Sequence, residues 1–161
     1  MGILTRDMQR VVREQRLGFH ATVCADGTPN LSPKGTTAVW DDEHLFFADI
    51  RSPATIANIR RGSRVEVNVV DPFVRKGYRF KGTAAVYERE TEEYAQGLRR
   101  LSAEGYATPA DRIQAIVLIK VEHAAPLNSP VYDDGASEAE VVPFWEEHFA
   151  QLRGRLLGRP T

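Results

Sequence analysis

The sequence predicts a mainly β fold of the α+β class, a six-stranded antiparallel barrel with flanking helices. Six β-prone segments follow one another, and most are joined by connections of only a few residues. One helical segment stands between the third and fourth strands, and further helical segments lie near both ends of the chain. A doubly wound parallel sheet is disfavoured, because it needs a helical crossover between most strands and several connections are too short for one.

The six predicted strands are β-prone runs that end at turn residues. Asp26-Gly27 makes a tight turn between the first two strands, which are therefore expected to form a hairpin. In the fourth strand, valines alternate with polar residues, which indicates that one face is buried. The predicted strands cover residues 17–25, 29–39, 44–50, 64–71, 78–87 and 115–121.

The helices are predicted from apolar spacing and from capping residues. An amphipathic N-terminal helix is expected over about residues 5–16, where a threonine can cap its first turn. A C-terminal helix is expected over about residues 138–156, with an apolar side of aromatic residues and leucines. Between the third and fourth strands, Ser52 suits an N-cap, Pro53 the first helical position and Gly62 the residue after the helix end.

The composition indicates one globular domain over residues 1–161, with one substantial core and no room for a second catalytic domain. Because 21 basic residues are balanced by 22 acidic ones, no global field attracts nucleic acid or a membrane, and neither is an expected partner. Cys24 is the single cysteine, and no apolar run is long enough to span a membrane. The first residues also lack the apolar core of a signal peptide, so a cytoplasmic location is expected. The four histidines are dispersed without metal-ligand spacing, so no metal site is expected.

The start of the helix at Ser52 is the first candidate binding site. A helix start presents unpaired backbone N–H groups and the positive end of the peptide dipoles, so an anion fits there. Arg51 adds a permanent cation, while Ser52 and Thr55 offer hydroxyls that can donate to phosphate oxygens. The alternative interpretation is that Ser52 only caps the helix and Arg51 is solvated.

A second candidate site lies in the predicted second strand. Ser32-Pro33-Lys34-Gly35-Thr36 is a polar stretch in which a proline removes a backbone donor and a glycine permits close approach by another group. This segment is therefore expected to line a ligand rather than to form an ordinary central strand, and Lys34 can meet a phosphate. An exposed lysine at a bulged sheet edge is the equally plausible alternative.

Two further groups are weaker candidates. Arg79 and Lys81 lie on one face of the fifth predicted strand, and Arg79 is expected to help neutralise the ligand if that face points toward it. A solvent-facing pair over an aromatic core face is the alternative. Tyr132 belongs to a polar loop after the last strand that could cover a substrate pocket, although loop composition alone also explains it.

The order of these segments resembles the pyridoxamine 5'-phosphate oxidase-like family of FMN-binding split barrels. The resemblance rests on GTPNLSPKG, then LFFADIRSPATIANIRRGSRVEVNVVD, then GYRFKGTAAV, and it extends from about Gly18 to His123. It implies a six-stranded split barrel and a homodimer with two FMN sites at the subunit interface. Each FMN phosphate would be held near the start of the helix between strands three and four.

The resemblance also implies roles for individual residues. Ser52 stands where the family usually has a serine of its phosphate-binding motif, and Asp49 lies just before that loop. The strand around Ser32 to Thr36, which contains Lys34 and Gly35, would run beside the isoalloxazine ring. The family's serine is typically followed by Arg-Lys, whereas Pro53-Ala54 follows here, so two phosphate cations are absent and Arg51 or Lys34 would have to compensate.

The implied function is an FMN-dependent oxidoreductase that acts on an unidentified small molecule, with a nicotinamide as a possible hydride donor. The C-terminal segment with which true pyridoxamine phosphate oxidases close on their substrate is not recognisable, so that particular activity is disfavoured. The alternatives are a non-catalytic flavin-binding or flavin-storage protein, and a related barrel that uses a deazaflavin or haem.

Overall fold

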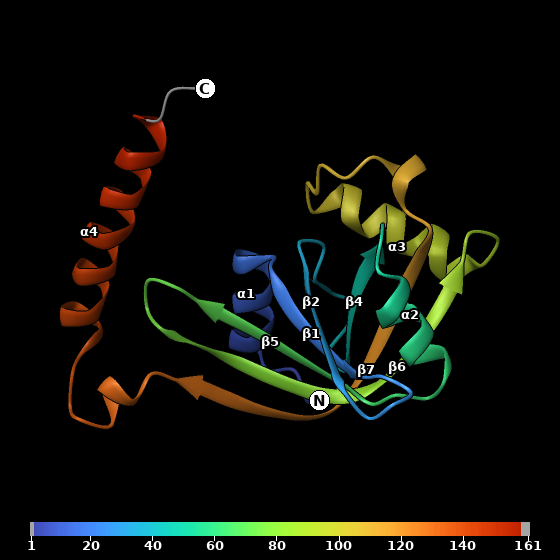
Figure 1. The fold of residues 1–161 in the computed structure, drawn as a ribbon, viewed down its shortest axis with the longest axis horizontal. Helices are drawn as coiled ribbons and strands as arrows, with labels where there is room; N and C mark the ends of the chain where they lie inside the picture. Colours follow the sequence, from blue (N-terminus) through green and yellow to red (C-terminus); the bar gives the residue numbers. More distant parts are fainter. Residues whose placement is uncertain (1, 159–161) are drawn as a thin grey trace.

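The computed structural model describes residues 2–158 of the chain and contains one antiparallel sheet with helices around it (Figure 1). Its elements are α1 (Arg6–Gln15), β1 (Gly18–Val23), β2 (Pro29–Lys34), β3 (Ala38–Val39), β4 (His44–Asp49), α2 (Pro53–Arg60), β5 (Val65–Asp71), β6 (Lys76–Glu88), α3 (Glu92–Ala103), η1 (Ala110–Arg112), β7 (Ala115–Asn128), η2 (Pro130–Tyr132) and α4 (Glu138–Leu157).

The sheet has seven strands in the order β2-β1-β5-β6-β7-β4-β3, and every neighbouring pair is antiparallel. The two edge strands, β2 and β3, are consecutive in the chain and are joined only by residues 35–37. A link of this length spans at most about 15 Å between the flanking Cα atoms. The sheet is therefore curled into a split barrel whose two edges approach each other without pairing.

The antiparallel split barrel with flanking helices is confirmed, but the predicted strand count of six was wrong. The segment predicted as one strand over residues 29–39 is divided into β2 and β3, which lie at opposite edges of the sheet. The division has a physical reason at Thr36. Its Oγ1 donates to the carbonyl oxygen of Ala48 (3.2 Å) and accepts from the N–H of Ala48 (3.0 Å). These side-chain hydrogen bonds take the place of backbone sheet hydrogen bonds where the chain passes from one sheet edge to the other.

The two longest strands, β6 and β7, bend where their register shifts between Lys81 and Gly82. A Cβ atom at Gly82 would lie 1.8 Å from the carbonyl oxygen of Lys120, so only glycine permits this approach of the two backbones. The bend lets both strands take part in the curved wall of the barrel.

The core is divided by the pleat of β4. Leu45 and Phe47 point into the barrel, where they join valines of β5 and β7, Phe80 of β6 and apolar residues of α1. Phe46 and Ala48 point outward and pack with α3 and with Ile116 of β7. Since alternate residues of a strand face opposite sides, one apolar run supplies both clusters and β4 is buried on both faces.

The C-terminal helix α4 projects away from the barrel (Figure 1). Val141 is its only buried residue. Its middle is attached to the β5–β6 turn through the ring of Phe149, whose centroid lies 5.2 Å from that of Phe73, and through the guanidinium of Arg75, which lies 4.3 Å from the ring centroid of Trp145. Within residues 2–158, no helix combines the length and the apolar character needed to cross a membrane.

Candidate functional site

A buried lysine joins the end of β2 to the start of α2. Lys34 is only 6% exposed, and its Nζ donates to Ser32 Oγ (2.5 Å) and to Ser52 Oγ (2.7 Å). Its ammonium group also lies 5.5 Å from the ring centroid of Phe47. Two segments that are 18 residues apart in the chain therefore bring three polar side chains to one point.

Two effects on the pKa of Lys34 oppose each other. Burial lowers the pKa of Lys34 from its ordinary value, and the negative charge of Asp49 partly offsets this effect. Asp49 ends β4 and is only 7% exposed. Within the described residues, its Oδ1 atom has no hydrogen-bond partner. A buried acceptor without a donor is costly, so a ligand that donates a hydrogen bond here would be favoured.

Ser52 occupies the N-cap position of α2, yet its side chain makes no capping hydrogen bond in the described structure. Its Oγ accepts from Lys34 instead. The first turn of a helix has N–H groups without intrahelical partners, and here they are left free of the serine side chain. The interpretation of Ser52 as a cap alone is therefore not what the structure shows.

A pocket of about 370 Å³ opens beside this group. Its lining residues come from four segments of the chain: Ser32, Pro33, Lys34, Gly35, Thr36, Ala48, Ile50, Arg51, Ser52 and Thr108. A Cβ atom added at Gly35 would meet no atom within 4 Å, so the glycine leaves open space on the pocket wall. Arg51 and Ser52 also line a neighbouring pocket of about 400 Å³ that includes Asp49 and Arg60.

Seven of the residues predicted as binding residues are therefore brought together around two adjoining pockets. They are Ser32, Lys34, Gly35, Thr36, Asp49, Arg51 and Ser52. The hydroxyl of Thr36 is engaged by the backbone of Ala48, so its contribution to the wall is structural.

Thr55 lies in the first turn of α2 but faces the sheet. It is 2% exposed, and its Oγ1 accepts from Asn30 Nδ2 at 3.1 Å. The same amide group of Asn30 also donates to Thr22. This polar contact fastens α2 to β1 and β2, so Thr55 holds the helix in place and does not line either pocket.

Arg79 and Tyr132 are not brought to this group within one chain. Arg79 Nε lies 3.0 Å from Glu66 Oε1 on the neighbouring strand β5, and Lys81 pairs with the other oxygen of Glu66. Tyr132 Oη donates to the carbonyl oxygen of Val74 (2.5 Å), beneath the ammonium group of Lys76. Tyr132 therefore has partners within the chain, whereas Arg79 has the charge of Glu66 beside it but its buried Nε makes no hydrogen bond within the described residues.

Sequence reasoning missed Thr108 and Arg60 as neighbours of the site. Thr108 lines the first pocket from the loop before η1, and Arg60 lines the second from the last turn of α2. No local pattern marks Thr108, because its place depends on how α3 packs on the outside of β4. Arg60 could have been found, since it follows Ser52 on the same helix.

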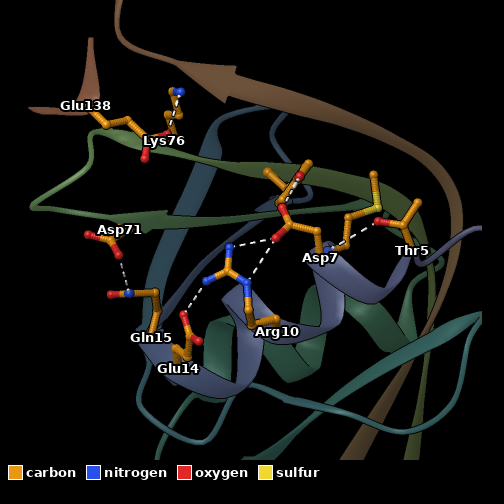
Figure 2. A network of polar contacts seen from close by, with 10 residues as sticks. Thr5, Asp7, Arg10, Glu14, Gln15, Asp71, Lys76 and Glu138 are labelled. Atoms are coloured by element: carbon orange, nitrogen blue, oxygen red, sulfur yellow. Dashed lines mark hydrogen bonds and ion pairs between the residues drawn. The ribbon is translucent and has the colours of Figure 1, made fainter.

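A third pocket, of about 480 Å³, lies between α1, β6 and β7 and differs in character. Figure 2 shows its polar side chains satisfying one another: Arg10 pairs with Asp7 (2.6 Å) and Glu14 (2.6 Å), and Lys76 pairs with Glu138 (2.8 Å). A ligand would have to break these pairs. The pocket beside Lys34 is therefore the better candidate for a ligand-binding site.

Within residues 2–158, no group of three or more acidic, cysteine or histidine side chains is placed to hold a metal.

Comparison with known proteins identifies the family of the chain. The sequence profile described as Pyridoxamine 5'-phosphate oxidase matches residues 4–127, which is most of the chain and includes every residue of the two pockets. The chain belongs to the pyridoxamine 5'-phosphate oxidase family. No curated protein sequence matches the chain significantly.

Several solved structures are similar to this chain. HupZ of Group A Streptococcus is 30% identical, with a TM-score of 0.68 over 79% of this chain and 96% of HupZ. A protein of Lactobacillus delbrueckii named as a candidate pyridoxamine 5'-phosphate oxidase is 27% identical, with a TM-score of 0.63 over 76% of this chain and 93% of that chain. An FMN-binding protein of Syntrophomonas wolfei is 16% identical, with a TM-score of 0.58 over 79% of this chain and 90% of that one, so it shares the fold.

Proposed function

We propose that this member of the pyridoxamine 5'-phosphate oxidase family is an FMN-dependent oxidoreductase that acts on a small molecule. The observation that carries the proposal is the position of Lys34, whose ammonium group is held between Ser32 and Ser52 at the start of α2. A buried cation, two hydroxyls and a helix start form a site suited to a phosphate.

The residues present fit the phosphate of FMN despite the missing Arg-Lys pair. Lys34, Ser52 and Arg51 would hold it, with Arg60 within the adjoining pocket. The unpaired Oδ1 of Asp49 suits a hydroxyl donor, and FMN has these in its ribityl chain. When bound, FMN would supply hydride-transfer chemistry, while the chain supplies position, charge and the exclusion of water.

We place the reaction partner in an adjoining groove. A groove of about 860 Å³ shares Ile50 and Arg51 with the pocket beside Lys34 and is also lined by Arg89 and Arg112. Arginines suit the phosphates of a nicotinamide dinucleotide, so this groove is our candidate for the hydride donor. Glu88, Glu90 and Asp111 line the same groove, so its formal charges balance and the arginines would act as local partners of the phosphates.

The proposal includes a homodimer in the cytoplasm. Phe19, Val23 and Leu31 are 45%, 51% and 65% exposed on the outer face of β1 and β2, which suits contact with a second copy. A cytoplasmic location accords with Cys24, which remains a free thiol.

The decisive experiment is cofactor uptake. The purified chain, incubated with FMN and then freed of unbound flavin, should retain the visible absorption bands of flavin in about one equivalent per chain. Retention of flavin followed by turnover with a nicotinamide donor indicates an enzyme, whereas retention without turnover for any donor indicates a flavin carrier. A chain that retains no FMN but takes up a deazaflavin or haem would contradict the proposed cofactor.

A further inference from the structure

The link of residues 35–37 between β2 and β3 is held at its last residue, Thr37. This residue is fully buried, and its Oγ1 donates to the carbonyl oxygen of Lys34 at 2.8 Å. The same hydroxyl accepts from Nε2 of His20, which lies 2.9 Å away inside the barrel. From the outer side of the barrel, Tyr106 Oη donates to the carbonyl oxygen of Thr37 at 2.8 Å. Thr37 is therefore fixed by one contact from inside the barrel and by another from outside it.

The contact inside the barrel depends on a glycine. Gly18 is the cross-strand partner of Lys34 in the ladder between β1 and β2. A Cβ atom at Gly18 would lie 2.6 Å from Thr37 Oγ1 and 3.0 Å from His20 Nε2, so any larger residue would push these atoms from their places. The missing side chain at Gly18 therefore leaves room for this hydrogen bond directly beside Lys34.

The contact outside the barrel is supported by the end of α1 and by the loop after α3. The guanidinium of Arg16 lies 4.7 Å from the ring centroid of Tyr106. Arg16 also donates to the carbonyl oxygens of Glu104 (2.8 Å) and Gly105 (3.2 Å), which fixes the loop that carries Tyr106. Thr108, two residues further along, lines the pocket beside the lysine. The same loop therefore holds the β2–β3 link and forms part of the pocket wall.

Lys34 needs such support because its neighbours in the sequence give little. It ends β2, and the residue that follows is Gly35, whose backbone has the widest range of conformations. Its own side chain is long, so it loses much conformational entropy when it is fixed. Thr37 holds its carbonyl oxygen, while Ser32 and Ser52 hold its ammonium group. Losing the contact with Thr37 would free the backbone and let the ammonium group leave its place.

We propose that Thr37 is a positioning residue for the phosphate of the flavin, because it holds the backbone of Lys34. This inference rests on the proposed function, since it assumes that Lys34 contacts the phosphate. Within the described residues, Thr37 lines neither of the two pockets, so it would affect the phosphate only through Lys34. The property that Thr37 should control is the phosphate preference, by which we mean the affinity for FMN divided by the affinity for riboflavin. Riboflavin has the same ring and ribityl chain without the phosphate, so this ratio isolates the phosphate contact.

The first test compares two substitutions at Thr37. Thr37→Val keeps the shape of the side chain but removes the hydroxyl, and it should lower the phosphate preference by about three- to tenfold, a usual coupling within one hydrogen-bond network. Thr37→Ser keeps the hydroxyl and should retain the wild-type preference within about twofold. Both variants should lose stability, the first through polar groups left without partners and the second through a lost methyl group, so stability does not separate them. A preference that is unchanged in Thr37→Val, or equally lowered in Thr37→Ser, would overturn the proposal.

The second test repeats Thr37→Val in a chain that lacks the ammonium group. In a Lys34→Met background, Thr37→Val should cause no further loss of phosphate preference, because no charge is left to be misplaced. A further loss of the same size would show that Thr37 acts by another route and would overturn the proposal.

Lys34→Met alone distinguishes this inference from the proposed function. If it leaves the phosphate preference unchanged, the phosphate is not at Lys34 and both proposals are wrong. If it lowers the preference while Thr37→Val does not, only the role of Thr37 is wrong.

The third test decides the question if Thr37→Val does not fold. Tyr106→Phe removes only the outer hydrogen bond to Thr37 and should lower the phosphate preference by about threefold. Tyr94→Phe is the matched control, because Tyr94 Oη donates to the carbonyl oxygen of Ile113 at the same distance of 2.8 Å. This control should keep the wild-type preference. Equal phosphate preferences in the two tyrosine variants would then overturn the proposal.

Discussion

Lys34 is the residue on which the site depends. Burying an ammonium group is costly, and Ser32 and Ser52 offset only part of that cost because they are neutral. Burial lowers the pKa of Lys34 from its ordinary value although the charge of Asp49 opposes the shift, so the ammonium group is only partly compensated. An anion in the adjoining pocket would remove this penalty, so the buried charge makes best sense as one half of a charge-assisted contact.

Gly35 gives a residue-scale prediction about how closely a ligand approaches. A valine at this position meets no atom of the chain within 4 Å of its Cβ, so Gly35→Val should leave the unfolding midpoint unchanged or slightly higher. The side chain would instead occupy the pocket, and FMN affinity should fall by about tenfold, equivalent to about 1.4 kcal/mol. Titration of FMN and chemical denaturation of the same variant would measure both effects. Undiminished affinity would show that the ligand does not approach this wall.

His20 gives a prediction about pH. It lies inside the barrel at 1% exposure, where Nε2 is 2.9 Å from Thr37 Oγ1. The Thr37 hydroxyl donates its hydrogen to the carbonyl oxygen of Lys34, so the network assigns the donor in the first contact to His20 Nε2. Burial, aided by the charge of Lys34, lowers the pKa of His20 to about 3.

The sign of the effect follows from that depressed pKa. The unfolded chain binds the proton more tightly than the folded chain, so stability is full above about pH 6.5 and is lost as the pH falls. Between about pH 7.5 and pH 5, the wild type should lose about 2 kcal/mol of unfolding free energy that His20→Gln does not lose. Urea denaturation at the two pH values is the measurement, and equal losses in both proteins would exclude His20 as the cause.

At the scale of elements, α2 begins differently from the other helices. Thr5 and Thr91 cap α1 and α3 by accepting from Met8 N–H (3.3 Å) and Tyr94 N–H (3.2 Å), whereas Ser52 turns its hydroxyl to Lys34. The start of α2, which faces the pocket, therefore has no side-chain cap among the described residues. This is the arrangement expected when a ligand, rather than a side chain, is to satisfy the first N–H groups.

The difference between these caps is testable. Thr91→Ala should cost about 1 kcal/mol of unfolding free energy, the usual value for a lost cap. Ser52→Ala should also cost stability, but through the lost contact with the Lys34 ammonium group rather than through a lost cap. In a Lys34→Met background, Ser52→Ala should therefore change the unfolding free energy by less than about 0.5 kcal/mol. Denaturant titration of Thr91→Ala and of Ser52→Ala in that background compares the two positions. If Ser52→Ala costs as much as Thr91→Ala when Lys34 is absent, then Ser52 does act as a cap in solution.

The sequence predicted most elements because their signals are local. The alternation of valines marks β5, and Ser52-Pro53 followed by Gly62 marks α2 almost to the residue. The break between β2 and β3 could be suspected from Pro33 and Gly35 but not located. It is fixed by the side chain of Thr36 bonding to Ala48, a contact that exists only once β4 is in place.

At the scale of the whole molecule, the site is a product of barrel curvature. The short link between the two sheet edges brings Lys34 to the start of α2, and the packing of α3 brings Thr108 to the same pocket. Sequence could name Lys34 and Ser52 separately, since each lies in a locally unusual segment. The sequence could not show that Lys34 and Ser52 form a hydrogen bond, because this contact depends on the register of β1 with its two neighbours, β2 and β5.

The most direct test compares FMN with riboflavin, which lacks the phosphate. If Lys34 and Ser52 hold that phosphate, Lys34→Met should lower FMN affinity by roughly 10- to 150-fold, the equivalent of one charge-assisted hydrogen bond. Riboflavin affinity should change by no more than about twofold, because the lost contact is to the phosphate alone. Calorimetric titration of both flavins into both proteins gives the four values needed. An unchanged FMN affinity, or an equal loss for riboflavin, would contradict the phosphate site at Lys34.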